Sequence, residues 1–180
     1  MEYKTEIMDS DALTRSIKRI SHEILENNKG TNNLILVGIK RRGVPIARMI
    51  ADNIYNIEGK HVEIESLDIT FYRDDLTKFN EDPTLNNPFE SKVNLNGKTV
   101  VLVDDVIFTG RTVRAAMDAI LNYARPEYIK LAVIIDRGHR QLPIRPDYVG
   151  KNVPTSKDEY ISVCVKEIDN TDNVYLIKNS

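Results

Sequence analysis

Thirteen consecutive residues, 100–112, constrain the fold of this chain more than any other segment. They begin with Val-Val-Leu-Val, an apolar run typical of a strand that is buried on both faces of a parallel sheet. Asp104 and Asp105 close the run, and a Thr-Gly-Arg-Thr turn leads into a helical pattern from Val113 to about Leu121. A buried strand, a turn and a helix in this order predict an α/β fold.

The polar residues of this segment predict a ligand site. In open α/β sheets, ligands bind at the carboxyl ends of strands and at the N-termini of the helices that follow. Two carboxylates suit the hydroxyls of a sugar, and the N–H and hydroxyl donors of residues 109–112 suit a phosphate. Each piece alone has an ordinary explanation, because Asp often caps a helix and Thr-Gly is common in turns. Together they favour a site for a phosphorylated ribose.

The rest of the chain fits the same architecture. Leu13, Ile17, Ile20 and Ile24 form one apolar stripe, which predicts a helix from Ser10 or Asp9 to about Asn28. Further patterns indicate strands at 34–39, 62–69, 129–135 and around Ile161, Val163 and Val165, and a helix at 44–55 with Pro45 in its first turn. Strands interleaved with helices predict a mainly parallel, doubly wound sheet in a single domain spanning residues 1–180.

Composition excludes several classes of protein. A net charge of −2 argues against a protein that coats nucleic acid through bulk charge, although a local basic face is compatible with it. The single cysteine, Cys164, rules out a disulfide framework and is expected to be a buried core thiol. The first residues lack an apolar signal segment, and no apolar run approaches the ~20 residues that span a bilayer. We therefore expect a soluble, cytoplasmic protein without a membrane partner.

A basic loop follows the predicted strand at 34–39. The spacing of Gly38 and Gly43 invites a P-loop interpretation, but Val44-Pro45 stands where Lys-Ser/Thr is required, which excludes a Walker A site. A cationic loop, Lys40-Arg41-Arg42-Gly43, remains at the carboxyl end of a strand. It is either a solvated turn or a place where a pyrophosphate could sit.

Two other basic segments have an ordinary and a functional interpretation. Arg15, Lys18, Arg19 and His22 lie opposite the apolar stripe of the first helix. Such a pattern is usually a solvated face, and a contact surface for nucleic acid is the alternative. Residues 136–157 are polar and basic, and they leave the carboxyl end of a strand. They are either a surface loop or part of the mouth of the same site.

Four segments of the chain together resemble one known family of proteins. Residues 100–112 are similar to the 5-phosphoribosyl-1-pyrophosphate (PRPP) signature of type I phosphoribosyltransferases. Asp-Ile-Thr-Phe-Tyr-Arg-Asp-Asp at 68–75, Asp-Arg-Gly-His-Arg-Gln-Leu-Pro-Ile-Arg at 136–145 and Asp-Tyr-Val-Gly-Lys-Asn-Val-Pro-Thr-Ser at 147–156 extend the resemblance to one family among them. That family is the bifunctional pyrimidine operon regulators with uracil phosphoribosyltransferase activity. Arg41 departs from the Thr common there, which leaves the contribution of position 41 open.

The resemblance implies a fold and a double function. The fold has a core sheet, a flexible lid over about 72–92 and a small hood over about 136–157. The implied enzyme would convert uracil and PRPP to UMP and pyrophosphate with Mg2+, which would be bound mainly through PRPP and water, its protein ligands unspecified. When UMP is present, the same protein would bind the leader of pyrimidine-operon mRNA and promote transcription termination (attenuation) or otherwise lower expression. Such proteins are homodimers or higher homo-oligomers.

The resemblance also implies roles for individual residues. The expected catalytic residues are Asp104, Asp105 and Arg42. The expected substrate-binding residues, in chain order, are Arg41, Arg42, Tyr72, Arg73, Asp104, Asp105, Val106, Ile107, Phe108, Thr109, Gly110, Arg111, Thr112 and Arg137. The expected RNA-binding residues are Arg15, Lys18, Arg19, His22, His139, Arg140, Arg145 and Lys151. The alternatives are a plain phosphoribosyltransferase for another nucleobase, and an RNA-binding sensor whose catalysis has decayed.

Overall fold

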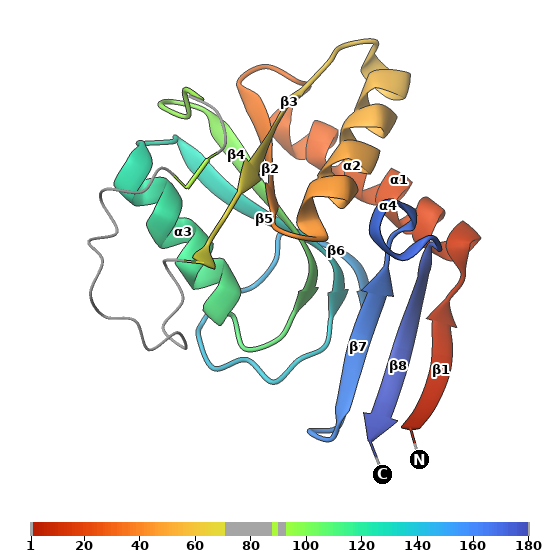
Figure 1. Ribbon diagram of the computed structural model, residues 1–180. Coiled ribbons are helices and arrows are strands. Elements are labelled where there is room, and N and C mark those ends of the chain that lie inside the picture. The colour runs from red at the N-terminus through yellow and green to blue at the C-terminus, as the bar shows by residue number, and fades with distance from the viewer. Residues whose placement is uncertain (1, 71–87, 90–92, 180) are drawn as a thin grey trace.

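A five-stranded parallel sheet forms the centre of the computed structural model, which describes residues 2–70, 88–89 and 93–179 (Figure 1). Its strands lie in the order β3-β2-β4-β5-β6, and every neighbouring pair is parallel. The strands are β2 (Leu34–Ile39), β3 (Glu63–Leu67), β4 (Thr99–Ile107), β5 (Tyr128–Asp136) and β6 (Tyr148–Asn152). The predicted α/β class and mainly parallel sheet are confirmed.

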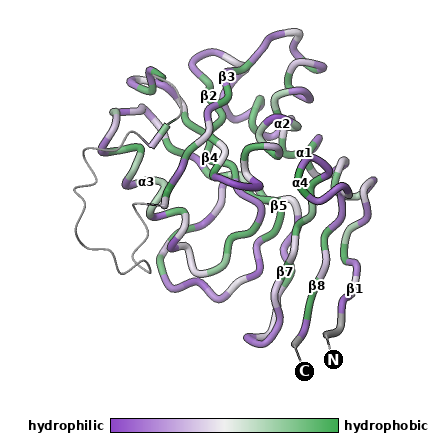
Figure 2. Tube along the Cα trace, in the orientation of Figure 1, coloured by the Kyte–Doolittle hydropathy of each residue, from purple (hydrophilic) through white to green (hydrophobic). Residues whose placement is uncertain are grey.

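Helices cover both faces of this sheet, as a doubly wound fold requires. The helices α1 (Ser10–Asn28) and α2 (Gly43–Glu58) lie on one face, and α3 (Arg111–Tyr123) lies on the other (Figure 1). Leu36 packs in the cluster with α1 and α2, whereas its neighbours Ile35 and Val37 pack in the cluster with α3. Side chains alternate across a strand, so a strand apolar at every position fills both cores (Figure 2).

The first helix forms as its sequence predicts. The side chain of Asp9 accepts a hydrogen bond of 2.7 Å from the N–H of Ala12, which caps the helix N-terminus. All four residues of the apolar stripe are buried, and Lys29 ends the helix in the left-handed conformation. The charged residues opposite the stripe therefore face away from the core.

The chain ends form a second, antiparallel sheet in the order β1-β8-β7. Its strands are β1 (Glu2–Met8), β7 (Glu159–Cys164) and β8 (Asn173–Asn179), and the turn α4 (Lys166–Asp169) joins the last two. The two termini consequently lie side by side (Figure 1). We call these three strands the small sheet.

The small sheet differs from the hood expected over residues 136–157. Part of that range is β6, the fifth strand of the main sheet, whereas the alternating stretch around Ile161 belongs to the small sheet. The local pattern of β6 is weak because Gly150 and two polar residues occupy it. Its pairing with β5 makes it a strand. The two strands approach closely at Gly150, because a Cβ there would lie 2.5 Å from the carbonyl oxygen of Ile134.

Some expected bounds and burials are corrected. β4 continues to Ile107, so the two aspartates lie inside the strand and not after it, because β5 continues to pair with this segment. Helix α2 extends beyond Tyr55 to Glu58 and ends at Gly59. Cys164 is half-buried and is not a core thiol, because its side chain alternates with those of buried Val163 and Val165.

Two expectations have a narrower outcome. The lid expected over about 72–92 lies outside the described residues, apart from residues 88–89. Within the part of the chain that the structure describes, no helix has the length and apolar character needed to cross a bilayer.

Candidate active site

A pocket of about 360 Å3 opens at the carboxyl ends of three neighbouring strands. Ile39, Lys40 and Arg41 line it at the end of β2, and residues 68–70 line it after β3. Asp104, Asp105 and Val106 of β4 and Thr112 of α3 complete the lining. The position at this edge of the sheet is the one predicted from the sequence.

The acidic pair is fixed by its own backbone. Asp104 is buried, and its Oδ1 accepts from the N–H of Asp105 at 2.9 Å. The Oδ1 of Asp105 accepts from the N–H of Val106 at 2.7 Å. Burial, together with the charge of Asp105, raises the pKa of Asp104 well above its usual value, and burial also raises the pKa of Asp105. Hydroxyl donors of a ligand would compensate these poorly solvated carboxylates.

Residues 108–112 form a loop, here called the phosphate loop, that presents the N-terminus of α3. Gly110 precedes the helix with a φ of +92°, and the Oγ1 of Thr109 accepts from the N–H of Arg111 at 3.3 Å. The first N–H groups of a helix lack partners within the helix and carry partial positive charge. An anion would therefore bind at this end of the pocket.

The segment after β5 braces the phosphate loop. Arg140 donates from Nη1 to the carbonyl oxygen of Phe108 at 2.7 Å and from Nη2 to Asp136 at 2.6 Å. Gln141 donates its backbone N–H to the carbonyl oxygen of Thr109 at 2.9 Å, and its Oε1 accepts from the Nε of Arg111 at 2.8 Å. The phosphate loop is therefore held by the segment after β5 as well as by α3.

Arg137 contacts the phosphate loop through the ring of Phe108. Its side chain is buried, donating from Nε to the Oγ1 of Thr155 at 3.1 Å and from Nη2 to the carbonyl oxygen of Glu159 at 2.6 Å. Its guanidinium carbon lies 4.0 Å from the centroid of the Phe108 ring, which is 40% exposed. Arg137 thus lies beside the expected substrate residues and does not line the pocket.

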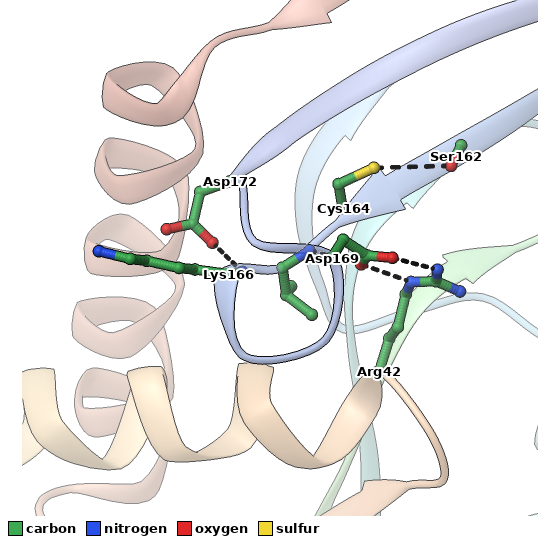
Figure 3. Close-up of polar contacts among 7 residues, drawn as sticks. Arg42, Ser162, Cys164, Lys166, Asp169 and Asp172 are labelled. Atoms are coloured by element: carbon green, nitrogen blue, oxygen red, sulfur yellow. Dashed lines mark hydrogen bonds and ion pairs between the residues drawn. The ribbon is translucent and has the colours of Figure 1, made fainter.

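The basic loop at 40–43, here called the pyrophosphate loop, divides its arginines between two environments. Arg41 is exposed and lines the pocket. Arg42 is half-buried, and its guanidinium pairs with Asp169 of α4 (Figure 3). The Lys40–Arg41 peptide bond is cis.

Some pocket residues were not among the individual site residues expected from the sequence. The Nζ of Lys40 lies 3.6 Å from the Oδ2 of Asp68, whose Oδ1 accepts from the hydroxyl of Thr70 at 2.6 Å. That hydrogen bond from Thr70 is the main reason that the pKa of Asp68 is lowered. A signal was present, since Lys40 directly follows the predicted strand at 34–39, and Asp68 and Thr70 lie at the end of the predicted strand at 62–69. Two expected residues, Tyr72 and Arg73, lie outside the described residues.

The expected RNA-binding residues fall into two groups. Arg15, Arg19 and Lys151 line a groove of about 350 Å3 between α1, β1 and β6, and Lys18 and His22 are exposed on α1. Arg19 is anchored there by hydrogen bonds to the carbonyl oxygens of Val149 and Gly150 at 3.0 and 2.6 Å. The other group, in the loop after β5, consists of His139, Arg140 and Arg145. The first two contact Phe108 of the phosphate loop, His139 through its ring and Arg140 through a hydrogen bond.

Comparison with known proteins identifies the family. The model of the phosphoribosyl transferase domain matches residues 4–168. The proteins named bifunctional protein PyrR from Clostridium perfringens (strain SM101) and Clostridioides difficile (strain 630) are 53% and 58% identical to this chain. The alignments cover 99% and 97% of this chain and 100% and 98% of those proteins. The chain belongs to the PyrR family of phosphoribosyltransferases.

Solved structures support the fold independently. A hypoxanthine phosphoribosyltransferase from Staphylococcus aureus superposes with a TM-score of 0.72 over 97% of this chain and 91% of that one, at 16% identity. The hypoxanthine phosphoribosyltransferase of Trypanosoma cruzi gives a TM-score of 0.73 over 98% and 97% of the two chains, at 15% identity. At these identities the likeness establishes the type I phosphoribosyltransferase fold alone.

Proposed function

We propose that this protein transfers the phosphoribosyl group of PRPP to uracil, giving UMP and pyrophosphate, and that with UMP bound it regulates pyrimidine biosynthesis genes by binding their leader mRNA. The observation that carries the first part is the pocket that joins the acidic pair to the phosphate loop. Full-length identity of 53–58% to proteins named bifunctional PyrR supports the second activity.

The proposed reaction needs orientation and charge stabilisation more than a nucleophile from the protein. Loss of pyrophosphate leaves positive charge on the anomeric carbon, as in glycoside hydrolysis. Asp104 and Asp105 would hold the ribose hydroxyls and stabilise that charge, while N1 of uracil attacks. The phosphate loop would bind the 5'-phosphate through N–H groups and the hydroxyls of Thr109 and Thr112. Arg41 and Arg42 would face the pyrophosphate.

Magnesium fits this site as an ion that the substrate carries. Within residues 2–70, 88–89 and 93–179, no cluster of three or more His, Cys, Asp or Glu side chains could hold a metal ion. Mg2+ commonly binds through one or two carboxylates together with substrate phosphates and water. Asp105, whose carboxylate reaches the pocket, is suited to such a contact. The ion would neutralise charge on the pyrophosphate.

The RNA surface would be the groove beside α1 together with the basic loop after β5. Arg15, Arg19 and Lys151 gather positive charge at the groove although the whole chain is slightly acidic. RNA loops expose phosphates and unstacked bases, so a local basic patch suffices for binding.

We also propose that the protein acts in the cytoplasm and that it forms a homodimer or higher homo-oligomer. Analytical ultracentrifugation would test the oligomeric state.

One experiment tests the proposed reaction directly. The purified protein is incubated with PRPP, Mg2+ and each nucleobase in turn, and the nucleotides formed are identified by mass spectrometry. We expect UMP from uracil. Formation of a purine nucleotide would instead identify a plain phosphoribosyltransferase for another base. Leader-RNA binding without any nucleotide formation would identify a sensor without catalysis.

A further inference from the structure

The side chain of Arg42 is held by a residue that follows it by 127 positions in the chain. Arg42 immediately precedes α2, beside the pyrophosphate-loop residues that line the pocket. Its Nε donates to the Oδ2 of Asp169 at 3.2 Å, and its Nη2 donates to Oδ1 at 2.8 Å (Figure 3). Such a two-point contact fixes the direction of the guanidinium as well as its position.

The carboxylate of Asp169 is itself fixed. Its Oδ2 also accepts from the N–H of Val165 at 2.9 Å, which closes the turn of α4. The side chain of Asp172 accepts from the N–H of Lys166 at 2.7 Å and braces the same turn (Figure 3). The side chain of Asp169 is 19% exposed, so solvent screens its pair with Arg42 less than it screens a surface pair.

This geometry leaves part of the guanidinium directed elsewhere. Arginine carries five N–H donors, and Asp169 engages one on Nε and one on Nη2. The Nη1 donors remain outside the pair. The hydrogen bond to Asp169 raises the pKa of Arg42, and the negative charges of Asp169 and Asp105 add to that rise, so the guanidinium lies within electrostatic reach of the acidic pair.

We propose that Asp169 is a positioning residue that holds Arg42 in place for the pyrophosphate of PRPP, an inference that rests on the proposed phosphoribosyltransferase reaction. Immobilising a long arginine side chain costs conformational entropy. When the fold bears this cost in advance, the bound substrate does not. The turn α4, which joins β7 and β8 of the small sheet, thereby contributes to a site otherwise built at the edge of the main sheet.

The test separates substrate binding from folding. Asp169→Asn keeps the shape and removes the charge, and we expect it to raise the KM for PRPP about 10-fold, with the KM for uracil and kcat changed less. Asp169→Glu, which keeps the carboxylate, should recover part of this loss. The matched control is Glu167→Ala, because Glu167 pairs with Arg48 between the same two helices but does not contact Arg42. It should leave the KM for PRPP unchanged.

A double-variant cycle decides whether Asp169 acts through Arg42. In an Arg42→Ala background, Asp169→Asn should raise the KM for PRPP no further. The inference is overturned if Arg42→Ala itself leaves that KM unchanged, or if the two effects add. It is also overturned if Asp169→Asn and Glu167→Ala lower the melting temperature equally and neither changes the KM.

Calorimetry keeps this inference distinguishable from the proposed function. Titration of the full chain with pyrophosphate and Mg2+ measures binding without turnover. If the wild-type protein forms no nucleotide from any base, the proposed function fails. The positioning role then still stands if Asp169→Asn weakens pyrophosphate binding about 10-fold relative to wild type and to Glu167→Ala, and it falls if all three bind alike.

Discussion

Asp104, one residue of the acidic pair, is expected to serve catalysis at a cost to the stability of the folded state. Asp104 is buried, and its pKa is raised by burial and by the charge of Asp105. A carboxyl whose pKa is raised by folding binds its proton more tightly in the folded state. Its contribution to stability is therefore present at acid pH and is lost as the pH rises above about 4. Active sites commonly retain such unfavourable charges.

Asp104→Asn should stabilise the protein and impair the enzyme. The amide oxygen can still accept the hydrogen bond from Asp105, while the buried charge is removed. We expect the free energy of unfolding at pH 7.5 to rise by about 1 kcal/mol. The gain should be smaller at pH 5, as measured by urea denaturation at both values. An equal change at the two pH values would contradict a buried charge at this position.

Asp105→Ala should reduce kcat/KM for UMP synthesis by about 100-fold, equivalent to about 2.7 kcal/mol of transition-state stabilisation. The variant removes an acceptor for the ribose hydroxyls. Steady-state kinetics with PRPP and uracil measure the loss. Asp52→Ala, at an exposed position of α2, is the matched control and should retain full activity. Near-normal activity of a correctly folded Asp105→Ala protein would remove the acidic pair from the mechanism.

Among the elements, the phosphate loop depends on a turn that only glycine adopts easily. Gly110 has a φ of +92°, and a Cβ there would lie 3.5 to 3.6 Å from atoms of Leu142, Arg140 and Ile144. The added atom would therefore fit, but the backbone conformation would be strained. Relaxing that strain would turn the N–H groups of the loop away from the phosphate.

Gly110→Ala should destabilise the fold by about 1–2 kcal/mol and raise the KM for PRPP. Thermal denaturation and steady-state kinetics measure the two effects. Gly97→Ala is a matched control, because Gly97 has a φ of +67° with no atom within 4 Å of an added Cβ and lies outside the pocket lining. It should show a similar loss of stability with an unchanged KM. Equal KM values for both variants would argue against a phosphate site at this loop.

At the scale of the whole molecule, RNA binding and catalysis are expected to use different surfaces. Arg15 and Lys18 are exposed on α1 and lie outside the lining of the active-site pocket. Arg140, in contrast, is anchored to the phosphate loop, so its substitution would disturb both activities. Variants on α1 therefore separate the two functions more cleanly.

Arg15→Ala combined with Lys18→Ala should weaken leader-RNA binding and leave UMP synthesis within a few-fold of wild type. If both side chains contact phosphates of single-stranded RNA, the slope of log affinity against log salt should flatten by about 1.4, at ~0.7 per contact. Filter binding at several salt concentrations measures the slope. Lys60→Ala with Lys178→Ala, two exposed lysines elsewhere, is the control. Intact RNA affinity with abolished catalysis would contradict this division.

Elements with local signals could be predicted from the amino-acid sequence alone. The strand and turn at 100–112, the α1 helix with its Asp9 cap and the apolar strands β2 and β5 all follow from periodicity, capping and turn chemistry. The edge of the sheet that carries the pocket also follows, because parallel strands present their carboxyl ends together.

Which basic side chains line the pocket and which pair within the protein became clear only from the folded structure. Arg41 and Arg42 are adjacent in the sequence, yet one lines the pocket and the other pairs with Asp169. Arg137 follows β5 as predicted, but contacts from the small sheet bury it. Local sequence patterns likewise did not predict that β1 pairs with β8 or that β6 pairs with β5. Residues that lie far apart in the chain leave no periodic signal of their contact in the sequence, because side-chain packing and strand pairing bring them together only in the folded protein.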